Sequence, residues 1–255
     1  MKIISLNTWG GRAGRDGLLA FFEKYKESVD IFCLQEMWSA SYDHLEGKNA
    51  GGVPIDNASI MTHGVQDISK ILINHSAYFR PHLRDNYGIM IFVKKDIEVI
   101  EEGEEFVYKH NGYIPEGDAG NHARNIQYVV IKKDGKKLAI YNIHGLWNGK
   151  GKTDTEDRLL QSRNIAELIK KHNMDSVLCG DFNLLPDTES VRIIENSGMK
   201  NLIKEYNITS TRTSFYNKPV KFADYIFTST SIVIKDFKVL PDEVSDHAPL
   251  FLEII

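Results

Sequence analysis

The sequence predicts a mixed α/β fold, and three observations support this prediction. Short apolar runs of strand length alternate with segments whose apolar residues recur at helical spacing. A chain of 255 residues is long enough for one large α/β domain with a substantial core. Polar motifs follow apolar runs near both ends of the chain, and these motifs must meet to form one site. We therefore expect a single domain over residues 1–255.

The first half of the chain begins with a strand over residues 2–7 and an amphipathic helix over 18–27. The nearly continuous apolar run at 29–34 predicts a strand that is buried on both faces. The polar segment 39–64 predicts a long loop of the kind that is usually functional or mobile. The other elements expected here are a short helix over 66–74 and strands over 77–83, 87–93 and 97–106.

The second half contains another long loop, expected over residues 109–121. The Asp134-Gly135 dipeptide predicts a hairpin turn, and the apolar spacing at 155–172 predicts a long helix. A helix over 188–196 has Asp187 or Thr188 as its expected N-cap. The remaining expected strands are 123–131, 137–143, 176–179, 223–228, 232–240 and 249–254.

The composition is that of an ordinary globular protein, with 42% hydrophobic and 26% charged residues. A formal net charge of -4 gives no global attraction to nucleic acid or to anionic membranes. No apolar run is long enough for a transmembrane helix, and the first strand leaves no room for a signal peptide. Cys33 and Cys179 lie in apolar runs and read as buried, reduced thiols. We therefore expect a cytoplasmic protein, as a monomer.

Five polar segments stand where strand-like runs stop, and they carry most of the functional information. Hard oxygen ligands, a base for water and donors for phosphate oxygens are the parts that a divalent-metal site for phosphoester cleavage requires. Carboxylates, amides and imidazoles at these positions supply all three kinds of group. The segments are Ser5-Leu6-Asn7-Thr8-Trp9, Leu34-Gln35-Glu36, Asn142-Ile143-His144, Gly180-Asp181-Phe182-Asn183 and Ser245-Asp246-His247-Ala248-Pro249.

With these segments and Asp224-Tyr225-Ile226, the chain resembles the endonuclease/exonuclease/phosphatase superfamily, the DNase I-like proteins. The resemblance runs from Asn7 to Pro249. It implies a four-layer α/β sandwich, in which two packed mixed β-sheets are flanked by helices. It also implies a site where the strand ends of both sheets converge.

In this resemblance Glu36 is the principal Mg²⁺ ligand, and Mn²⁺ is the expected substitute. Asn7 and Asp246 would assist the metal, directly or through water. His247 is the candidate base, because an imidazole can take a proton from water at neutral pH. Asp224 would orient His247 and stabilise its charged form.

Asp181 would position the attacking water, and the resemblance leaves open whether Asp181 or His247 is the base. Asn183 and His144 would donate hydrogen bonds to the phosphoryl oxygens as negative charge develops. The expected substrate-binding residues are Arg124, Trp147 and Asn142. Arg124 can equally pair with a carboxylate, and Trp147 can equally be a core residue.

The expected function is Mg²⁺-dependent hydrolysis of a phosphoester, by a nuclease, another phosphodiesterase or a phosphatase. Nucleic acid is slightly favoured as substrate over small phosphoesters. A sphingomyelinase-like enzyme shares the Gly-Asp-Phe-Asn and Ser-Asp-His spellings, but no amphipathic segment for a bilayer is evident. A catalytically silent binding module on the same fold is the non-enzyme alternative. A serine or cysteine hydrolase is disfavoured, because there is no G-x-S-x-G motif.

Overall fold

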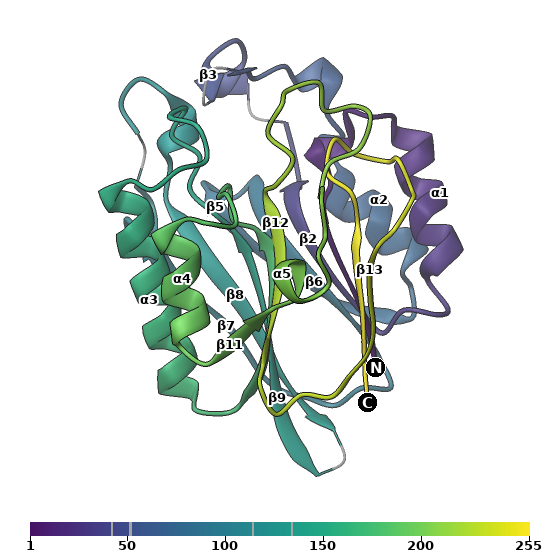
Figure 1. The fold of residues 1–255 in the computed structure, drawn as a ribbon. Helices are drawn as coiled ribbons and strands as arrows, with labels where there is room; N and C mark the ends of the chain where they lie inside the picture. The colour runs from purple at the N-terminus through teal and green to yellow at the C-terminus, as the bar shows by residue number, and fades with distance from the viewer. Residues whose placement is uncertain (42, 51–52, 114, 134) are drawn as a thin grey trace.

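The computed structural model describes residues 1–41, 43–50, 53–113, 115–133 and 135–255. Two six-stranded mixed β-sheets form its centre, and Figure 1 shows them between the helices on either side. The first sheet has the order β13-β14-β1-β2-β6-β5, with β1 and β2 parallel. Its strands are β1 (Lys2–Asn7), β2 (Ile31–Trp38), β5 (His75–Leu83), β6 (Tyr87–Lys94), β13 (Ile234–Val239) and β14 (Leu250–Ile254).

The second sheet has the order β11-β12-β10-β9-β8-β7, with β9 and β10 parallel. The two sheets, with helices outside both, form the expected four-layer sandwich, so the predicted fold class is confirmed. The strands of this sheet are β7 (Val99–Tyr108), β8 (Arg124–Lys133), β9 (Lys136–His144), β10 (Asp175–Asp181), β11 (Met199–Asn201) and β12 (Asp224–Ser229).

The helices cover the outer faces of the sheets. In Figure 1, α1 (Arg15–Tyr25) and α2 (Gly64–Ile71) lie on one side of the molecule, and α3 (Glu156–His172) and α4 (Glu189–Asn196) lie on the other. Thr188 is the N-cap of α4, because its side chain accepts a hydrogen bond from the Val191 amide. Among the described residues, no helix is both long and apolar enough to cross a membrane.

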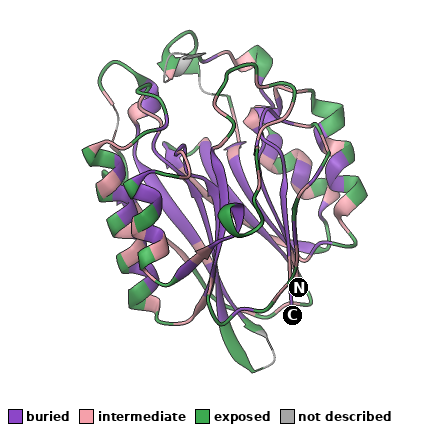
Figure 2. Ribbon diagram, viewed as in Figure 1, coloured by how far each residue is buried: buried purple, intermediate pink, exposed green. Residues whose placement is uncertain are grey.

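Two apolar cores result from this layering, and Figure 2 shows the strands as the most buried part of the chain. The larger core lies between the sheets and continues beneath α3 and α4, where Ile165 and Ile194 are fully buried. The smaller core joins the outer face of the first sheet to α1 and α2 through Leu18, Phe22 and Ile68. Because most strands are buried on both faces, they read as apolar runs in the sequence.

The structure also contains elements that the sequence pattern did not reveal. The loop after β2 contains the two-residue strands β3 (Asn49–Ala50) and β4 (Val53–Pro54). The short strand β11 and the one-turn helix α5 (Leu202–Glu205) follow α4. Such short elements have too few residues to show a periodicity. The β8–β9 hairpin forms as expected, but Asp134 of its predicted turn lies outside the described residues.

A pair of buried amides joins the two sheets near the ends of β2 and β9. Gln35 Nε2 donates to Asn142 Oδ1 at 2.7 Å. Asn142 Nδ2 donates to the carbonyl oxygens of Leu34, at 3.0 Å, and Met90, at 3.1 Å. These contacts fix the distance between the sheets next to the point where the polar motifs emerge.

Candidate active site

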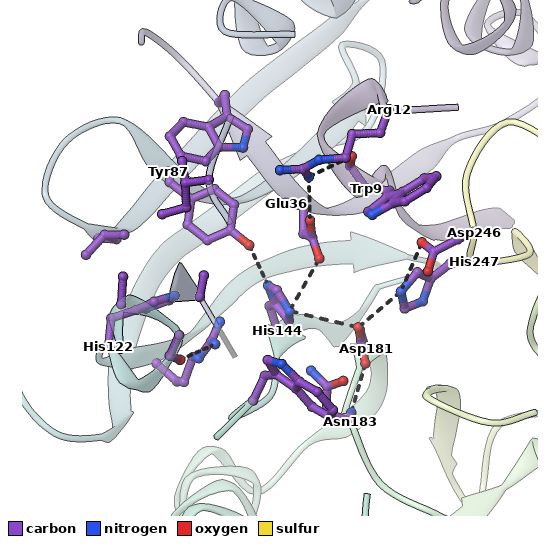
Figure 3. Close-up of a pocket in the computed structure, with 18 of the residues that line it drawn as sticks. Trp9, Arg12, Glu36, Tyr87, His122, His144, Asp181, Asn183, Asp246 and His247 are labelled. Carbon is purple, nitrogen blue, oxygen red and sulfur yellow. Dashed lines mark hydrogen bonds and ion pairs between the residues drawn. The ribbon is translucent and has the colours of Figure 1, made fainter. Parts of the chain in front are cut away.

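A β-bulge places the side chain of Glu36. The pairing of β2 with β6 shifts register between Leu34 and Met37, and Glu36 has a positive φ of 56°. Such a φ is uncommon for a residue other than glycine, and it often marks a functional site. A bulge re-aims the side chain that it contains, so Glu36 lies in the pocket that Figure 3 shows.

Two glycines allow the ends of β9 and β10 to come close together. A Cβ on Gly180 would lie 2.0 Å from the Ile143 carbonyl oxygen, and one on Gly145 would lie 2.5 Å from that of Phe182. Gly180 also has a φ of +147°. Because glycine has no Cβ atom, β9 and β10 approach closely enough for His144 and Asp181 to pair in register at the pocket end of the sheet.

Asn7 connects the carboxylates of the two sheets. Its Nδ2 donates to Glu36 Oε1 at 3.1 Å and to Asp181 Oδ2 at 2.9 Å, and its Oδ1 accepts from the Trp9 amide at 2.9 Å. His144 Nε2 lies 3.9 Å from both Glu36 Oε1 and Asp181 Oδ2. The amide of Asn7 therefore positions Glu36 and Asp181 around one point.

His247 and Asp224 form a buried pair on the other side of Asp181. His247 Nδ1 lies 2.8 Å from Asp224 Oδ1 and 2.9 Å from Asp224 Oδ2. Thr211 Oγ1 donates to Asp224 Oδ2 at 3.1 Å. The other ring nitrogen, Nε2, lies 3.6 Å from Asp181 Oδ2 and from Asp246 Oδ1. One nitrogen of His247 is thus committed to Asp224, and the other faces the pocket (Figure 3).

The pocket also contains cations and aromatic rings from segments far apart in the chain. Arg12 Nη1 lies 3.8 Å from Glu36 Oε2, and Arg212 Nη1 lies 2.9 Å from Asp246 Oδ2. The lining cations and rings include Arg12, Arg124, Lys152, Arg212, Trp9, Tyr87, Trp147 and Tyr216. The site is therefore a mixed-charge pocket with aromatic walls.

Burial and nearby cations give the two central carboxyl groups different acidities. Burial raises the pKa of Glu36 above its ordinary value, although Arg12 and His247 oppose the shift. Burial acts in the same direction on Asp181, but the charges of His247, Lys152 and Arg212 outweigh it and hold the pKa of Asp181 well below its usual range. Asp181 is therefore ionised at neutral pH.

The histidines of the site also differ. Burial and Arg212 act to lower the pKa of His247, but Asp224, Asp246 and Asp181 together raise it above the ordinary imidazole value. For His144, burial and then Arg124 lower the pKa well below that value. His247 can therefore hold a proton near neutral pH, whereas His144 is neutral and serves as a hydrogen-bond donor or acceptor.

Two separate groups of residues could hold a metal. Ligand atoms of Asp181, Asp224 and His247 lie within 4.8 Å of one another. Asp224 Oδ1 already contacts His247 Nδ1 at 2.8 Å, so an ion held by this group would compete with that pair. The second group consists of Glu36 and Asp246, which line the same pocket. Asp246 Oδ1 is buried and has no hydrogen-bond partner in the described part of the chain, which suits a cation ligand.

Most of the residues expected from sequence to form the site are brought together in this pocket. Glu36, His144, Asp181, Asn183, Asp246, His247, Arg124 and Trp147 line it, and Asn7 and Asp224 support it from behind. Asn142 does not line it. Its side chain is 0% exposed and lies between the sheets, where its hydrogen bonds are all to protein atoms.

Several pocket residues were not anticipated from the sequence: Arg12, Tyr87, His122, Lys152, Arg212 and Tyr216. Most of them belong to loops, where no periodicity or strand end marks a position. The Thr211-Arg212-Thr213 segment pairs with Asp246-His247 through an isolated bridge between Arg212 and His247. That contact is long-range and leaves no local signal in the sequence.

Comparison with known proteins supports this description. A sequence profile of the Endonuclease/Exonuclease/phosphatase family matches residues 4–247. No curated protein sequence matches the chain.

Three solved structures illustrate the similarity of fold. A mannosyl-6-phosphatase from Bacteroides thetaiotaomicron is 18% identical, with a TM-score of 0.73 over 100% of this chain and 99% of that one. D. rerio TDP2, solved with a single-strand DNA product, is 18% identical, with a TM-score of 0.65 over 100% and 98% of the two chains. The human Nocturnin catalytic domain, solved with a bound sulfate anion, is 15% identical, with a TM-score of 0.64 over 100% and 94%. By its profile match over nearly the whole chain, this protein belongs to the Endonuclease/Exonuclease/phosphatase family.

Proposed function

We propose that the protein is a Mg²⁺-dependent phosphoester hydrolase in which a water molecule attacks phosphorus. The observation that carries this proposal is the convergence of Glu36, Asp181 and Asp246 on one pocket next to the His247–Asp224 pair. Family membership supports the reaction type. A binding module would not need a carboxylate-oriented imidazole that faces a group of carboxylates.

Glu36 and Asp246 would hold the metal, because carboxylate oxygens are the ligands that Mg²⁺ prefers. Mn²⁺ is the expected substitute. Asn7 would act indirectly, since its Oδ1 already accepts from the Trp9 amide and its Nδ2 positions Glu36. When bound, the ion supplies Lewis acidity that polarises the phosphoryl group and stabilises its charge.

His247 Nε2 is the proposed base for the attacking water, and Asp224 stabilises the imidazolium that forms. Asp181 Oδ2 lies 3.6 Å from His247 Nε2, so one water can contact both groups, and Asp181 would orient that water. An oxygen–phosphorus bond forms as the bond from phosphorus to the leaving oxygen breaks. The water proton passes to His247, and the leaving oxygen receives a proton from solvent.

His144, Asn183 and Arg124 are proposed to bind the phosphoryl oxygens. The Tyr87 hydroxyl lies 3.4 Å from His144 Nδ1. If that nitrogen accepts from Tyr87, the proton lies on Nε2, which points toward the carboxylates and a bound phosphate. Arg124 is 1% exposed, and its Nε and Nη1 have no hydrogen-bond partner among the described residues. A phosphate would supply acceptors for both.

Two classes of substrate fit the aromatic walls of the pocket. A small phosphorylated metabolite is supported by the structural similarity to a mannosyl-6-phosphatase. The end of a nucleic acid is the second candidate, favoured by Trp9 and Trp147 in the lining and by the similarity to TDP2. We further propose a cytoplasmic monomer, and the two free, buried cysteines support a reducing environment.

The test is hydrolysis of a small panel in Mg²⁺, in Mn²⁺ and in EDTA, with His247→Gln as the inactive control. The panel contains p-nitrophenyl phosphate, bis-p-nitrophenyl phosphate, hexose 6-phosphates, single-stranded DNA and RNA, and sphingomyelin. Metal-dependent cleavage of one member that the variant does not cleave is the expected result. Cleavage that persists in EDTA, or in the variant at the same rate, would contradict the proposal.

A further inference from the structure

Lys152 lies in the pocket, and neither the sequence motifs nor the proposed mechanism gives it a role. Its side chain is 5% exposed, and its Nζ has no hydrogen-bond partner among the described residues. The ammonium group faces the ring of Tyr216, with 5.8 Å between Nζ and the ring centroid. A buried ammonium group without a hydrogen-bond partner is costly to a fold, so a ligand with acceptor oxygens would stabilise it.

The loop that carries Lys152 is held in place by Arg158, which is 0% exposed. The Arg158 guanidinium donates to the carbonyl oxygens of Leu146, Gly151 and Thr153, at 3.3, 2.7 and 2.6 Å. The carbonyl of Lys152 itself accepts from the Leu185 amide at 2.9 Å. The ammonium group therefore occupies a built position at the pocket, because the backbone on both sides of it is fixed.

The neighbouring cation on this side of the pocket is already paired. Arg212 binds Asp246, its side chain is 3% exposed, and its guanidinium stacks on the Tyr216 ring at 4.1 Å. Within the described part of the chain Lys152 forms no such ion pair, and Asp181 acts on it only through longer-range electrostatics. Burial lowers the pKa of Lys152 to about 8, so most of the ammonium remains charged at neutral pH.

The charges around the pocket indicate what kind of anion would fit. Five cations line the pocket, namely Arg12, Arg124, Lys152, Arg212 and Lys218, against the carboxylates Glu36, Asp181 and Asp246 in the lining and Asp224 behind it. A bound divalent ion would therefore leave an excess of three positive charges. A terminal phosphoryl group, which is a dianion, offsets more of this excess than an internal phosphodiester, which is a monoanion.

The number of unpartnered donors leads to the same conclusion. Arg124 offers Nε and Nη1, Arg212 offers Nε and Lys152 offers Nζ, from three separate segments of the chain. A phosphodiester has two non-bridging oxygens to share between the metal and these donors. A phosphomonoester has a third, which would leave an acceptor for Lys152.

We propose that Lys152 binds the third non-bridging oxygen of a terminal phosphoryl group, and that the site therefore prefers phosphomonoesters to phosphodiesters. This inference rests on the proposed hydrolase function and specifies its substrate class. Lys152 is then a specificity-determining residue, and the phosphorylated end of a small molecule or of a nucleic acid can occupy the pocket.

The test compares two esters that share a leaving group, p-nitrophenyl phosphate and methyl p-nitrophenyl phosphate. Lys152→Met should lower kcat/KM for the monoester by about 100-fold and that for the diester by less than about 5-fold. Lys152→Arg should recover a substantial part of the monoester activity. Lys150→Met is the matched control, because Lys150 belongs to the same loop but is exposed. Equal losses on both esters, or no loss on either, would overturn the proposal.

A binding measurement separates this proposal from the hydrolase function. Calorimetry in Mg²⁺ would compare inorganic phosphate with dimethyl phosphate. The wild-type protein should bind phosphate more tightly, and Lys152→Met should abolish the difference while the thermal midpoint stays equal or rises. If neither ester is hydrolysed but this pattern is found, the hydrolase function fails and the role of Lys152 stands. A preference for phosphate that Lys152→Met retains, or binding of neither anion by the wild-type protein, would overturn the role of Lys152.

Discussion

Gln35 and Glu36 are neighbours in β2, yet their side chains lie in different environments. Gln35 binds Asn142 at 2.7 Å, and Asn142 binds two main-chain carbonyls, so these amides join the sheets inside the core. One residue later, the bulge turns Glu36 into a pocket where Asp246 Oδ1 has no hydrogen-bond partner in the described part of the chain. The amide nitrogens of this core pair are bound by the protein, whereas Asp246 Oδ1 in the pocket is available to a ligand.

The same contrast separates Asn142 from His144 in β9. Alternate residues of a strand point to the same face of the sheet, so the sequence pattern places Asn142 and His144 in the same site. The two residues differ in their position along the strand. Asn142 lies between the sheets, whereas His144 lies at the end of the strand, next to the pocket. We therefore expect substitutions in the core layer to affect stability, and substitutions in the pocket layer to affect metal binding and turnover.

The largest expected effect is that of His247→Gln. Removal of the base should lower kcat/KM by about 1000-fold, within the range expected for general acid–base catalysis. Steady-state kinetics on the cleaved panel substrate measures this effect, and calorimetric Mg²⁺ binding should be retained. Turnover within about 10-fold of the wild-type value would remove His247 from the role of base.

The matching substitution in the core layer is Asn142→Leu. It leaves the two carbonyl groups and the Gln35 amide without this partner, and we expect the free energy of unfolding to fall by about 2–4 kcal/mol. Urea denaturation measures the loss. Turnover per folded molecule should be close to wild type, and a selective loss of turnover would return Asn142 to the substrate-binding residues.

In contrast to Asn142→Leu, Glu36→Gln should weaken Mg²⁺ binding without lowering the stability of the metal-free protein. Burial already raises the pKa of Glu36, so a neutral amide relieves the cost of an ionised, partly desolvated carboxylate. Mg²⁺ affinity should fall at least about 10-fold, while the metal-free thermal midpoint stays equal or rises. Calorimetric titration and thermal unfolding in EDTA measure the two quantities. An unaltered Mg²⁺ isotherm would exclude Glu36 as a ligand.

We expect three buried histidines near the pocket to lower the free energy of unfolding at acid pH. Burial, reinforced by Arg124, lowers the pKa of His82 to about 3 and the pKa values of His122 and His144 well below the ordinary value. Below about pH 6.5 the unfolded chain binds protons that the folded protein excludes, so the free energy of unfolding falls as the pH falls. Each histidine contributes up to about 1.4 kcal/mol per pH unit.

His247 contributes with the opposite sign, because its pKa is raised in the folded metal-free protein. Its contribution is complete below the unfolded value of about 6.5 and is lost as the pH rises through the folded value. Urea denaturation in EDTA across about pH 5 to 8, with His122→Asn and His247→Gln, separates the two effects. A slope below about pH 6.5 that His122→Asn leaves unchanged would contradict the assignment of His122.

The strand ends and their motifs were predictable because a buried strand appears in the sequence as an apolar run, and polar residues with catalytic potential follow where the run ends. Glu36 and Asp181 were found in this way, whereas His247 was found in the polar segment that precedes the last strand. Lys152 and Arg212 were not, since each belongs to a loop and reaches the pocket through contacts that are distant in sequence. The sequence predicts a substrate-binding role for Asn142, because neither residue type nor strand face shows whether a side chain lies between the sheets or in the pocket.

The most direct test of the account is hydrolysis in ¹⁸O-labelled water with Mg²⁺, using the panel substrate that the protein cleaves. The account predicts that each turnover places one labelled oxygen in the phosphoryl product and none in the leaving group, because water attacks phosphorus beside Asp181 and His247. A label in the leaving group, or no metal-dependent turnover of any panel member, would contradict it.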